Sequence, residues 1–320
     1  MTYLLKIKKN ILFKRKEYQV TKIMRNFFIS KKDIQFIQDF VEESIEKNYH
    51  KLEKILFWIL NNNESKKIRI KSNQFHNIIQ YSNLKKQDKD GWNALMIALF
   101  NYKKQNLYFT KEQWDYWIEH SDLKQQNKDG CNALMIALSN YKNQNLYFTK
   151  EQWDDLIQHS DLNQQDNTGA NAFMHALIYS KEQNLYFAKE QWDYWIEHSD
   201  LNQQMNNGMN VFLMMMFNQK EKQLNFTKEQ WKNIWNNLHI EQKEKNFRII
   251  CEEYESQNYF KEDILFVLND LDYKPTENMK KFLYEKKYIE IIQMMEQQKF
   301  FLKMNEDLPI KEKDKKTIKI

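Results

Sequence analysis

The sequence predicts an all-α protein, a solenoid in which one helical unit is repeated between degenerate caps. Three observations support this fold class. The chain has only four Gly and two Pro in 320 residues, so its turns must be few and stereotyped. The glycines stand at positions 91, 130, 169 and 208, a constant difference of 39, each within a version of one phrase. Between them, apolar residues recur at the spacing of a helix face.

The 39-residue repeat organises most of the chain. Residues 82–120, 121–159 and 160–198 align without a gap, and 199–240 continues the pattern more loosely. "NALMIALFNYKKQNLYFTKEQWDYWIEH" returns as "NALMIALSNYKNQNLYFTKEQWDDLIQH". We expect a basic N-terminal arm (1–32), capping helices with a degenerate repeat (33–81), four repeats (82–240), a C-terminal degenerate repeat with capping helices (241–303), and a charged tail (304–320).

Each repeat begins with an apolar helix. In the first repeat the residues of one helix face recur at i, i+1, i+4, i+5 and i+8, namely Ala94, Leu95, Ala98, Leu99 and Tyr102. Asn93 directly precedes this face and has an equivalent Asn in every repeat. Because an Asn side chain can accept a hydrogen bond from the first turn of a helix, the pattern predicts a helix that begins after Asn93.

The second helix of each repeat has a clear N-terminal signature. Thr110 followed by Gln113 forms a capping box, and the pair recurs in the second and fourth repeats. Phe109 and Trp114 flank it at the positions of a hydrophobic staple. The third repeat has Ala188 at the cap, which we expect to cost roughly 1 kcal/mol of local stability. We interpret the rows of Trp and Phe as core, and the alternative is a stacking platform for nucleic-acid bases.

The glycines end a tight turn before each first helix. The four segments read "DKDG", "NKDG", "DNTG" and "MNNG", mostly with Asp or Asn first and always with Gly last. This order is typical of a type I turn followed by a residue with positive φ. Glycine reaches that conformation without steric cost, so we expect it to supply a left-handed backbone at this corner of each repeat.

Taken together, these features resemble the ankyrin repeat family. "SDLNQQDNTGANAFMHAL" is similar to the family's Asp-x-Asn, D-x-x-G turn, capping residue and Leu-x-x-Ala, and the resemblance covers roughly 43–240. The chain departs from the family in its 39-residue period, where about 33 is usual, and in having Asn-Ala-Leu-Met where the family has Thr-Pro-Leu-His. The resemblance implies an ankyrin-like solenoid of hairpin–helix–helix units.

The resemblance also implies which residues face the concave groove. They occupy positions of the first helix at which the repeats differ from one another, with residues of the turn tips at the rim. The predicted protein-binding residues are Ile97, Phe100, Asn101, Ile136, Ser139, His175, Ile178, Tyr179, Met214 and Phe217, rimmed by Lys89, Lys128, Asn167 and Asn206. The alternative is that some of them, especially Ile97 and Phe100, pack beneath the neighbouring hairpin.

The sequence contains no recognisable catalytic or cofactor motif. Cys131 and Cys251 form no metal-ligand or disulfide pattern, and the equivalents of Cys131 are Trp, Ala and Met. His120, His159 and His198 recur once per repeat, too far apart to share one ion through ~2 Å bonds. We interpret them as helix C-caps with positive φ, the neighbouring Ser121 being the alternative cap. We expect no enzyme activity, catalytic residue, cofactor, metal or small-molecule substrate.

The basic arm is the exception to the repeated pattern. Residues 1–32 contain ten Lys and Arg and a single acid, Glu17, whereas the whole chain has a net charge of +5. Such an arm could contact an anionic membrane or nucleic acid. The alternatives are a basic helix that docks onto the acidic repeats and a frayed tail. No run of 18 apolar residues exists, and the N-terminus makes a poor signal peptide. We expect a cytoplasmic protein, or one exported into a host cell.

These inferences lead to one expected function. We predict a monomeric, non-enzymatic scaffold that binds another protein through the concave face of an ankyrin-like array. The alternative is a peripheral membrane or nucleic-acid binder that uses residues 1–32, with the repeats as its platform.

Overall fold

The computed structural model describes residues 14–22, 24, 31–46, 52–62, 72–101, 110–144, 148–183, 187–220, 226–256 and 261–306. Within these ranges the chain consists of helices and connecting turns, with two isolated β-bridges and no strand. The predicted all-α fold class is therefore confirmed. None of the helices described is long and apolar enough to cross a membrane.

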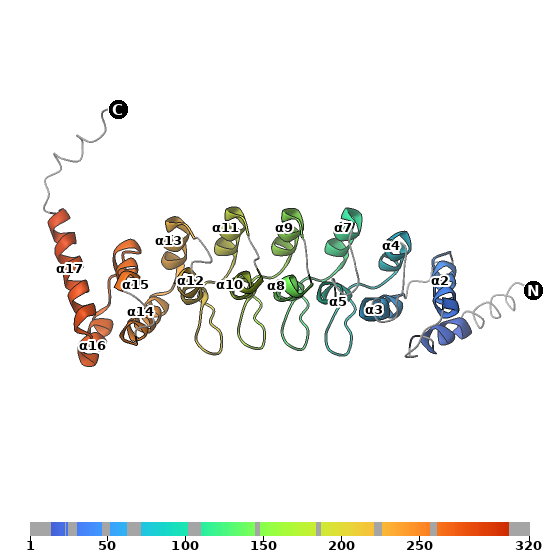
Figure 1. The fold of residues 1–320 in the computed structure, drawn as a ribbon, viewed down its shortest axis with the longest axis horizontal. Helices are drawn as coiled ribbons and strands as arrows, with labels where there is room; N and C mark the ends of the chain where they lie inside the picture. Colours follow the sequence, from blue (N-terminus) through green and yellow to red (C-terminus); the bar gives the residue numbers. More distant parts are fainter. Residues whose placement is uncertain are drawn as a thin grey trace, which may run out of the picture. The chain divides into compact units, whose positions relative to one another are not determined.

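The chain divides into two compact units, Met1–Gln191 and Trp192–Ile320. Figure 1 labels their helices. The first unit contains α2 (Lys31–Glu46), α3 (Glu53–Asn62), α4 (Ser72–Gln80), α5 (Ala94–Phe100), α7 (Lys111–His120), α8 (Ala133–Gln144), α9 (Lys150–His159) and α10 (Ala172–Gln183). The division falls within α11 (Lys189–His198). The second unit continues with α12 (Val211–Lys220), α13 (Lys228–Asn237), α14 (Ile240–Glu255), α15 (Lys261–Leu265), the π-helix η1 (Phe266–Asp270), α16 (Glu277–Lys286) and α17 (Ile289–Glu306).

The first helices begin where the Asn pattern predicts. Asn93 Oδ1 accepts a hydrogen bond from the backbone N–H of Met96 at 2.9 Å, and the equivalent Asn residues of the other repeats do the same. Asn93, Asn132 and Asn210 also donate hydrogen bonds beyond their own helix. Asn132 Nδ2 donates to the carbonyl of Asp161 at 3.2 Å and to Gln164 Oε1 at 3.1 Å. The N-cap therefore connects one repeat to the next and also satisfies a backbone N–H at the start of its helix.

The second helices carry the predicted capping boxes. Thr110 and Gln113 exchange both hydrogen bonds, as do their equivalents before α9 and α13. At the third repeat, Ala188 has no hydroxyl to offer, but its backbone N–H still donates to Gln191 Oε1 at 2.9 Å. The loss of the threonine therefore removes one half of the box and leaves the other.

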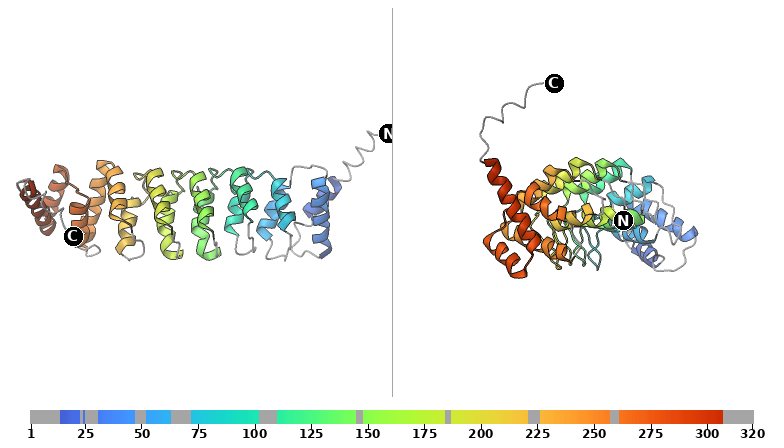
Figure 2. Two further views of the ribbon diagram at one scale, coloured as in Figure 1. Left: turned by 90° about the horizontal axis from the view of Figure 1, so that it is seen from above. Right: turned by 60° about the vertical axis from the view of Figure 1, so that its left-hand side comes forward.

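Helices of the same kind pack against one another in the first unit. α8 contacts both α5 and α10, and α7 contacts both α4 and α9. Figure 1 shows α5, α8 and α10 in one layer and α4, α7 and α9 in a second. Figure 2 shows the helix pairs of this unit following one another in chain order. Side chains Ala94 to Leu99 are all buried in this packing.

The aromatic rows form the core between second helices, as the sequence predicted. The centroid of the Phe148 ring lies 4.9 Å from that of Trp114, which belongs to the preceding repeat. It lies 5.1 Å from the centroid of Trp153, which belongs to the same repeat as Phe148. Phe187 lies 5.4 Å from Trp153 in the same way. Each Phe thus contacts the Trp of the repeat before it, which a staple within one repeat does not require. Phe109 and Tyr102 lie outside the described residues.

The glycine turns also form as predicted. All four glycines have positive φ, between 79° and 85°. In the first unit the turns are hydrogen-bonded to one another: the N–H of Lys128 donates to the carbonyl of Asp90 at 2.9 Å, and the N–H of Asn167 to that of Asp129 at 2.9 Å. The turns appear as loops below α5, α8 and α10 in Figure 1.

Beyond the four repeats, two of the described residues other than glycine also have a left-handed backbone. Asp272 and Lys287 have φ of 51° and 59°. Lys287 ends α16, where its N–H and that of Tyr288 donate to carbonyls of the last turn. These bonds satisfy helix-end carbonyls, which offsets the steric cost of a side chain at this position.

Part of the basic arm packs against the helices α2 and α3 of the first unit. Residues 14–22 are helical, with Val20 only 2% exposed. Lys16 Nζ lies 2.6 Å from Glu43 Oε2 on α2, and Trp58 Nε1 donates to the carbonyl of Met24 at 3.0 Å. This segment therefore docks on the capping helices α2 and α3. Residues 1–13, 23 and 25–30 of the arm lie outside the described residues.

Candidate functional site

The structure separates the predicted binding residues into buried and accessible groups. Ile97, Ile136, His175 and Met214 are between 3% and 8% exposed, and Asn101 is 9% exposed. These five side chains therefore offer almost no surface to a partner. In the first unit, α5, α8 and α10 pack against one another.

The other predicted residues are accessible. Phe100 and Phe217 are 39% and 47% exposed. Ser139, Ile178 and Tyr179 are half-buried, and the tip residues Lys89, Lys128, Asn167 and Asn206 are exposed. In the first unit, Phe100, Ser139 and Ile178 occupy equivalent positions on the packed helices α5, α8 and α10. Equivalent positions on packed helices place these three side chains in one row.

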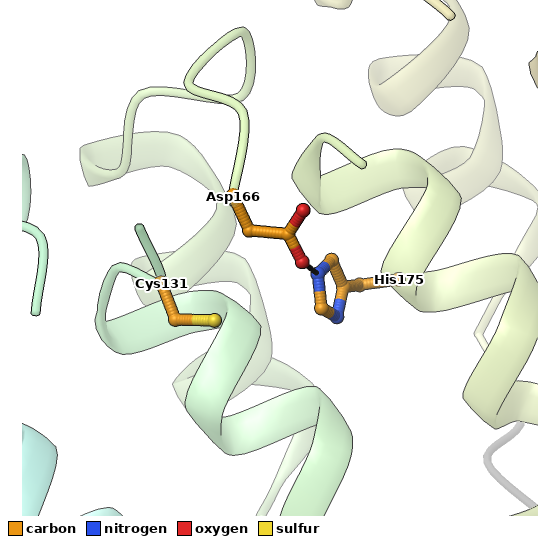
Figure 3. Close-up of side chains that lie close together, drawn as sticks. All are labelled: Cys131, Asp166 and His175. Atoms are coloured by element: carbon orange, nitrogen blue, oxygen red, sulfur yellow. Dashed lines mark hydrogen bonds and ion pairs between the residues drawn. The ribbon is translucent and has the colours of Figure 1, made fainter. Parts of the chain in front are cut away.

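A second constellation was not predicted from the sequence. Cys131, Asp166 and His175 each place a potential ligand atom within 4.8 Å of the other two. Cys131 precedes α8, Asp166 opens the glycine turn of the third repeat, and His175 lies on α10. Figure 3 shows the thiol, carboxylate and imidazole pointing toward one another, with the imidazole and carboxylate joined by a hydrogen bond. His175 Nε2 lies 2.9 Å from Asp166 Oδ2.

The turn holds the Asp166 carboxylate in a fixed orientation. Its Oδ1 accepts hydrogen bonds from the Thr168 N–H, the Thr168 hydroxyl and the Ala170 N–H, between 2.6 and 3.0 Å. Burial by itself would raise the pKa of Asp166, but the hydrogen bonds from His175, Thr168 and Ala170 outweigh it and hold that pKa well below its usual range. Asp166 is therefore ionised at neutral pH.

The imidazole lacks one hydrogen-bond partner, and the surroundings of the thiol disfavour its ionisation. The His175 side chain is 7% exposed, and its buried Nδ1 has no hydrogen-bond partner. Burial raises the pKa of the Cys131 thiol to about 11, helped by the negative charges of Asp166 and Asp129. A catalytic cysteine needs the opposite, a lowered pKa. The cluster therefore does not have the electrostatics of an activated nucleophile, although its three residue types occur in cysteine hydrolases.

Reading the repeats against one another could have indicated this cluster. At the position of Cys131 the other repeats have Trp92, Ala170 and Met209. At the position of His175 they have Ile97, Ile136 and Met214. Cys131 and His175 both differ from their equivalents in the other repeats, and they lie in adjacent repeats. This coincidence is the signal in the sequence that could have indicated the cluster. Their side chains meet because α10 packs on α8, a contact that periodicity along the sequence does not display.

The three histidines that recur once per repeat have a different structural role from the one expected. His120, His159 and His198 are exposed, and each Nδ1 donates to the carbonyl four residues earlier, at 2.8 to 3.1 Å. None of the three has positive φ. Ser121 and Ser160 are the C-caps of α7 and α9, with extended backbones. The interpretation of His as the C-cap is therefore wrong, and the serine alternative is correct.

No protein-family model matches this sequence, and no curated protein matches it. The accessible row and the Cys131–Asp166–His175 cluster therefore stand on their own geometry.

Proposed function

We propose that this chain is a non-enzymatic scaffold of ankyrin-like repeats, which binds another protein through the concave face of its repeat array. The observation that carries the proposal is the row formed by Phe100, Ser139 and Ile178 on neighbouring helices. A Phe that is 39% exposed is a large apolar group for a partner to cover. In this proposal the exposed polar turn tips form its rim, and an apolar centre with a polar rim is typical of protein-binding surfaces.

Hydrogen bonds between repeats support a preformed surface. Gln87 Nε2 donates to the carbonyl of Gln126 at 3.0 Å, and Gln126 Nε2 donates to that of Gln165 at 3.1 Å. Backbone hydrogen bonds between the turns, from Lys128 to Asp90 and from Asn167 to Asp129, join the same neighbouring repeats. A surface held in this way needs little additional ordering when a partner binds, so more of the contact energy contributes to affinity.

Burial narrows the proposed surface to a subset of the predicted residues. In the first unit it consists of Phe100, Ser139, Ile178 and Tyr179, rimmed by Lys89, Lys128 and Asn167. Phe217 and Asn206 are the accessible equivalents in the second unit. The buried residues support this surface from beneath and do not contact the partner.

The competing function assigns binding to the basic arm. Lys14, Arg15 and Lys22 are exposed on the helical segment that docks on the first unit, so they remain available to an anionic membrane or to nucleic acid. Binding through them would weaken steeply as salt is added, because screening and counterion release act on exposed charges.

Affinity capture from cell lysate tests the two functions against each other. The first variant is Phe100→Asp with Ile178→Asp, which places two charges in the row. Its matched control is Ile240→Asp with Ile289→Asp, since these side chains are 55% and 63% exposed and lie outside the row. The third variant changes the basic arm: Lys14→Glu with Arg15→Glu and Lys22→Glu. It leaves the Lys16–Glu43 ion pair intact.

The proposal expects one specific partner that is lost from the first variant and retained by the other two. If the partner survives the first variant and is lost only from the arm variant, and washes off at moderate salt, the arm carries the function. Circular dichroism must first show that every variant keeps the helical content of the parent chain.

A further inference from the structure

We propose that Cys131, Asp166 and His175 form a zinc-binding site between the second and third repeats. This is the one place in the described part of the chain where three His, Cys, Asp or Glu side chains bring ligand atoms together closely enough to hold a metal ion. The three come from two adjacent repeats, so an ion bound there would connect them.

The donor atoms match the chemistry of Zn²⁺. Thiolate sulfur, imidazole nitrogen and carboxylate oxygen are its usual ligands, at bond lengths of about 2.0–2.3 Å. Tetrahedral geometry at those lengths places the ligand atoms roughly 3.5 Å apart. The imidazole and carboxylate atoms are 2.9 Å apart, and all three ligand atoms lie within 4.8 Å of one another. Binding therefore requires the first pair to open slightly and the thiol to move by no more than about 1–1.5 Å, which side-chain rotation can supply.

Each donor has a lone pair available to the ion. Asp166 Oδ1 is occupied by three hydrogen bonds within its turn, whereas the bond described for Oδ2 is that with His175. His175 Nε2 faces the same space, and an unpartnered Nδ1 can take up the ring proton when Nε2 binds the ion. A bound cation also favours the thiolate form of Cys131, as metal ions generally do for coordinating thiols.

Three protein ligands leave one coordination position for water or for a donor from outside the chain. Catalytic zinc sites share this feature, but the cluster here has no neighbouring general base assigned to it, so the inference is binding alone. The site would add stability, since an ion that binds the folded state and not the unfolded chain shifts the equilibrium toward folding.

The repeats themselves provide conservative replacements for each ligand. Ala170 occupies the position equivalent to Cys131, Asn127 that of Asp166, and Ile136 that of His175. The variants Cys131→Ala, Asp166→Asn and His175→Ile therefore install residues that the same fold already accommodates one repeat away. The matched controls are Cys251→Ala and His120→Gln, which remove a thiol and an imidazole outside the cluster.

The experiment measures metal content and spectra of the full chain. The protein is stripped with chelator, dialysed against Zn²⁺, and analysed for bound zinc. We expect about one zinc per chain, retained in both controls and lost from each of the three ligand variants. With Co²⁺ as a spectroscopic substitute, we expect a thiolate-to-cobalt charge-transfer band that is absent in Cys131→Ala and present in Cys251→Ala.

Thermal unfolding gives a second measurement. Zinc at a hundredfold excess over Kd should raise Tm by roughly 5 °C in the parent chain and in the controls, and leave Tm of the ligand variants unchanged. Absence of bound zinc in the parent chain would overturn the proposal. So would zinc that remains in Cys131→Ala and His175→Ile, because that metal would be held elsewhere on the chain.

Discussion

Gly130 lies directly against the backbone of Asp166 in the next repeat. A Cβ atom added at Gly130 would stand 2.8 Å from Asp166 Cα and 2.9 Å from the backbone nitrogen of Asn167. Glycine is therefore required here twice, once for its φ of 79° and once for the approach of a neighbouring turn. Gly91 makes the same approach to Asn127, one repeat earlier, at 2.9 Å.

Gly208 allows these two requirements to be measured separately. Its φ is 85°, but an added Cβ would meet only the side chain of Lys245, at 3.4 Å. We expect Gly208→Ala to lower the free energy of unfolding by about 1–2 kcal/mol, the cost of a left-handed alanine. Gly130→Ala should cost a further 1–3 kcal/mol or so, because the neighbouring turn must move. Chemical denaturation measures both, and equal losses would show that the contact with Asp166 carries no energy.

Ala188 offers a stabilising substitution. The Gln191 half of its capping box is already in place, and only the hydroxyl is missing. Ala188→Thr should raise the free energy of unfolding by roughly 0.5–1 kcal/mol, and Thr149→Ala should lower it by about as much. Both values come from denaturant titration. No gain from Ala188→Thr would mean that a hydroxyl here cannot accept from the N–H of Gln191.

The local signals in the sequence predicted the local structure well. Capping boxes, Asn caps and glycine turns each depend on a few neighbouring residues, so the local sequence is enough to predict these elements. Left-handed residues without glycine, such as Lys287, escaped prediction because their cost is offset by hydrogen bonds to a helix end. The sequence alone does not display that compensation.

The candidate sites were harder to predict because they depend on contacts between repeats. Ile97 and Ile136 were expected to face a groove, but the first helices are covered on nearly every side, so helical periodicity could not separate a buried face from an exposed one. The Cys131–Asp166–His175 cluster joins residues that are distant in the sequence and adjacent only when α10 packs on α8.

The pair Tyr254 and Glu290 should be visible in an alkaline titration of the second unit. The Tyr254 hydroxyl donates to Glu290 Oε2 at 2.6 Å, and this bond, with burial, raises the pKa of Tyr254 to about 12. Since the ordinary value is about 10, the pair's contribution to stability is fully present below pH ~10 and is lost as pH rises toward 12.

Tyrosinate absorbance tests this assignment. The difference between the titrations of the parent chain and Tyr254→Phe isolates the single phenol, whose midpoint we expect near 12. Glu290→Gln should move that midpoint back toward 10, because the carboxylate no longer favours the protonated phenol. A midpoint that stays high in Glu290→Gln would assign the shift to burial instead.

Asn132 should be more than a helix cap. It is fully buried, it accepts from the N–H of Met135, and it donates to the Asp161 carbonyl and to Gln164 in the next repeat. Serine is as good an N-cap as asparagine, so a residue that only capped α8 would tolerate Asn132→Ser. Serine cannot reach the next repeat, so the Asp161 carbonyl and Gln164 Oε1 would lose their hydrogen-bond donor. We therefore expect the free energy of unfolding to fall by about 1–3 kcal/mol.

A buried negative charge at the same site should cost still more. Asn132→Asp keeps the shape and the cap but replaces both N–H donors by a carboxylate oxygen facing the Asp161 carbonyl, so we expect a loss greater than that of Asn132→Ser. Thr149→Ser provides the control for a cap that makes no bridge, and its free energy of unfolding should stay within about 0.5 kcal/mol of the parent. If Asn132→Ser is equally mild, the repeats are joined by packing and backbone bonds, and the Asn row contributes only to the helix ends.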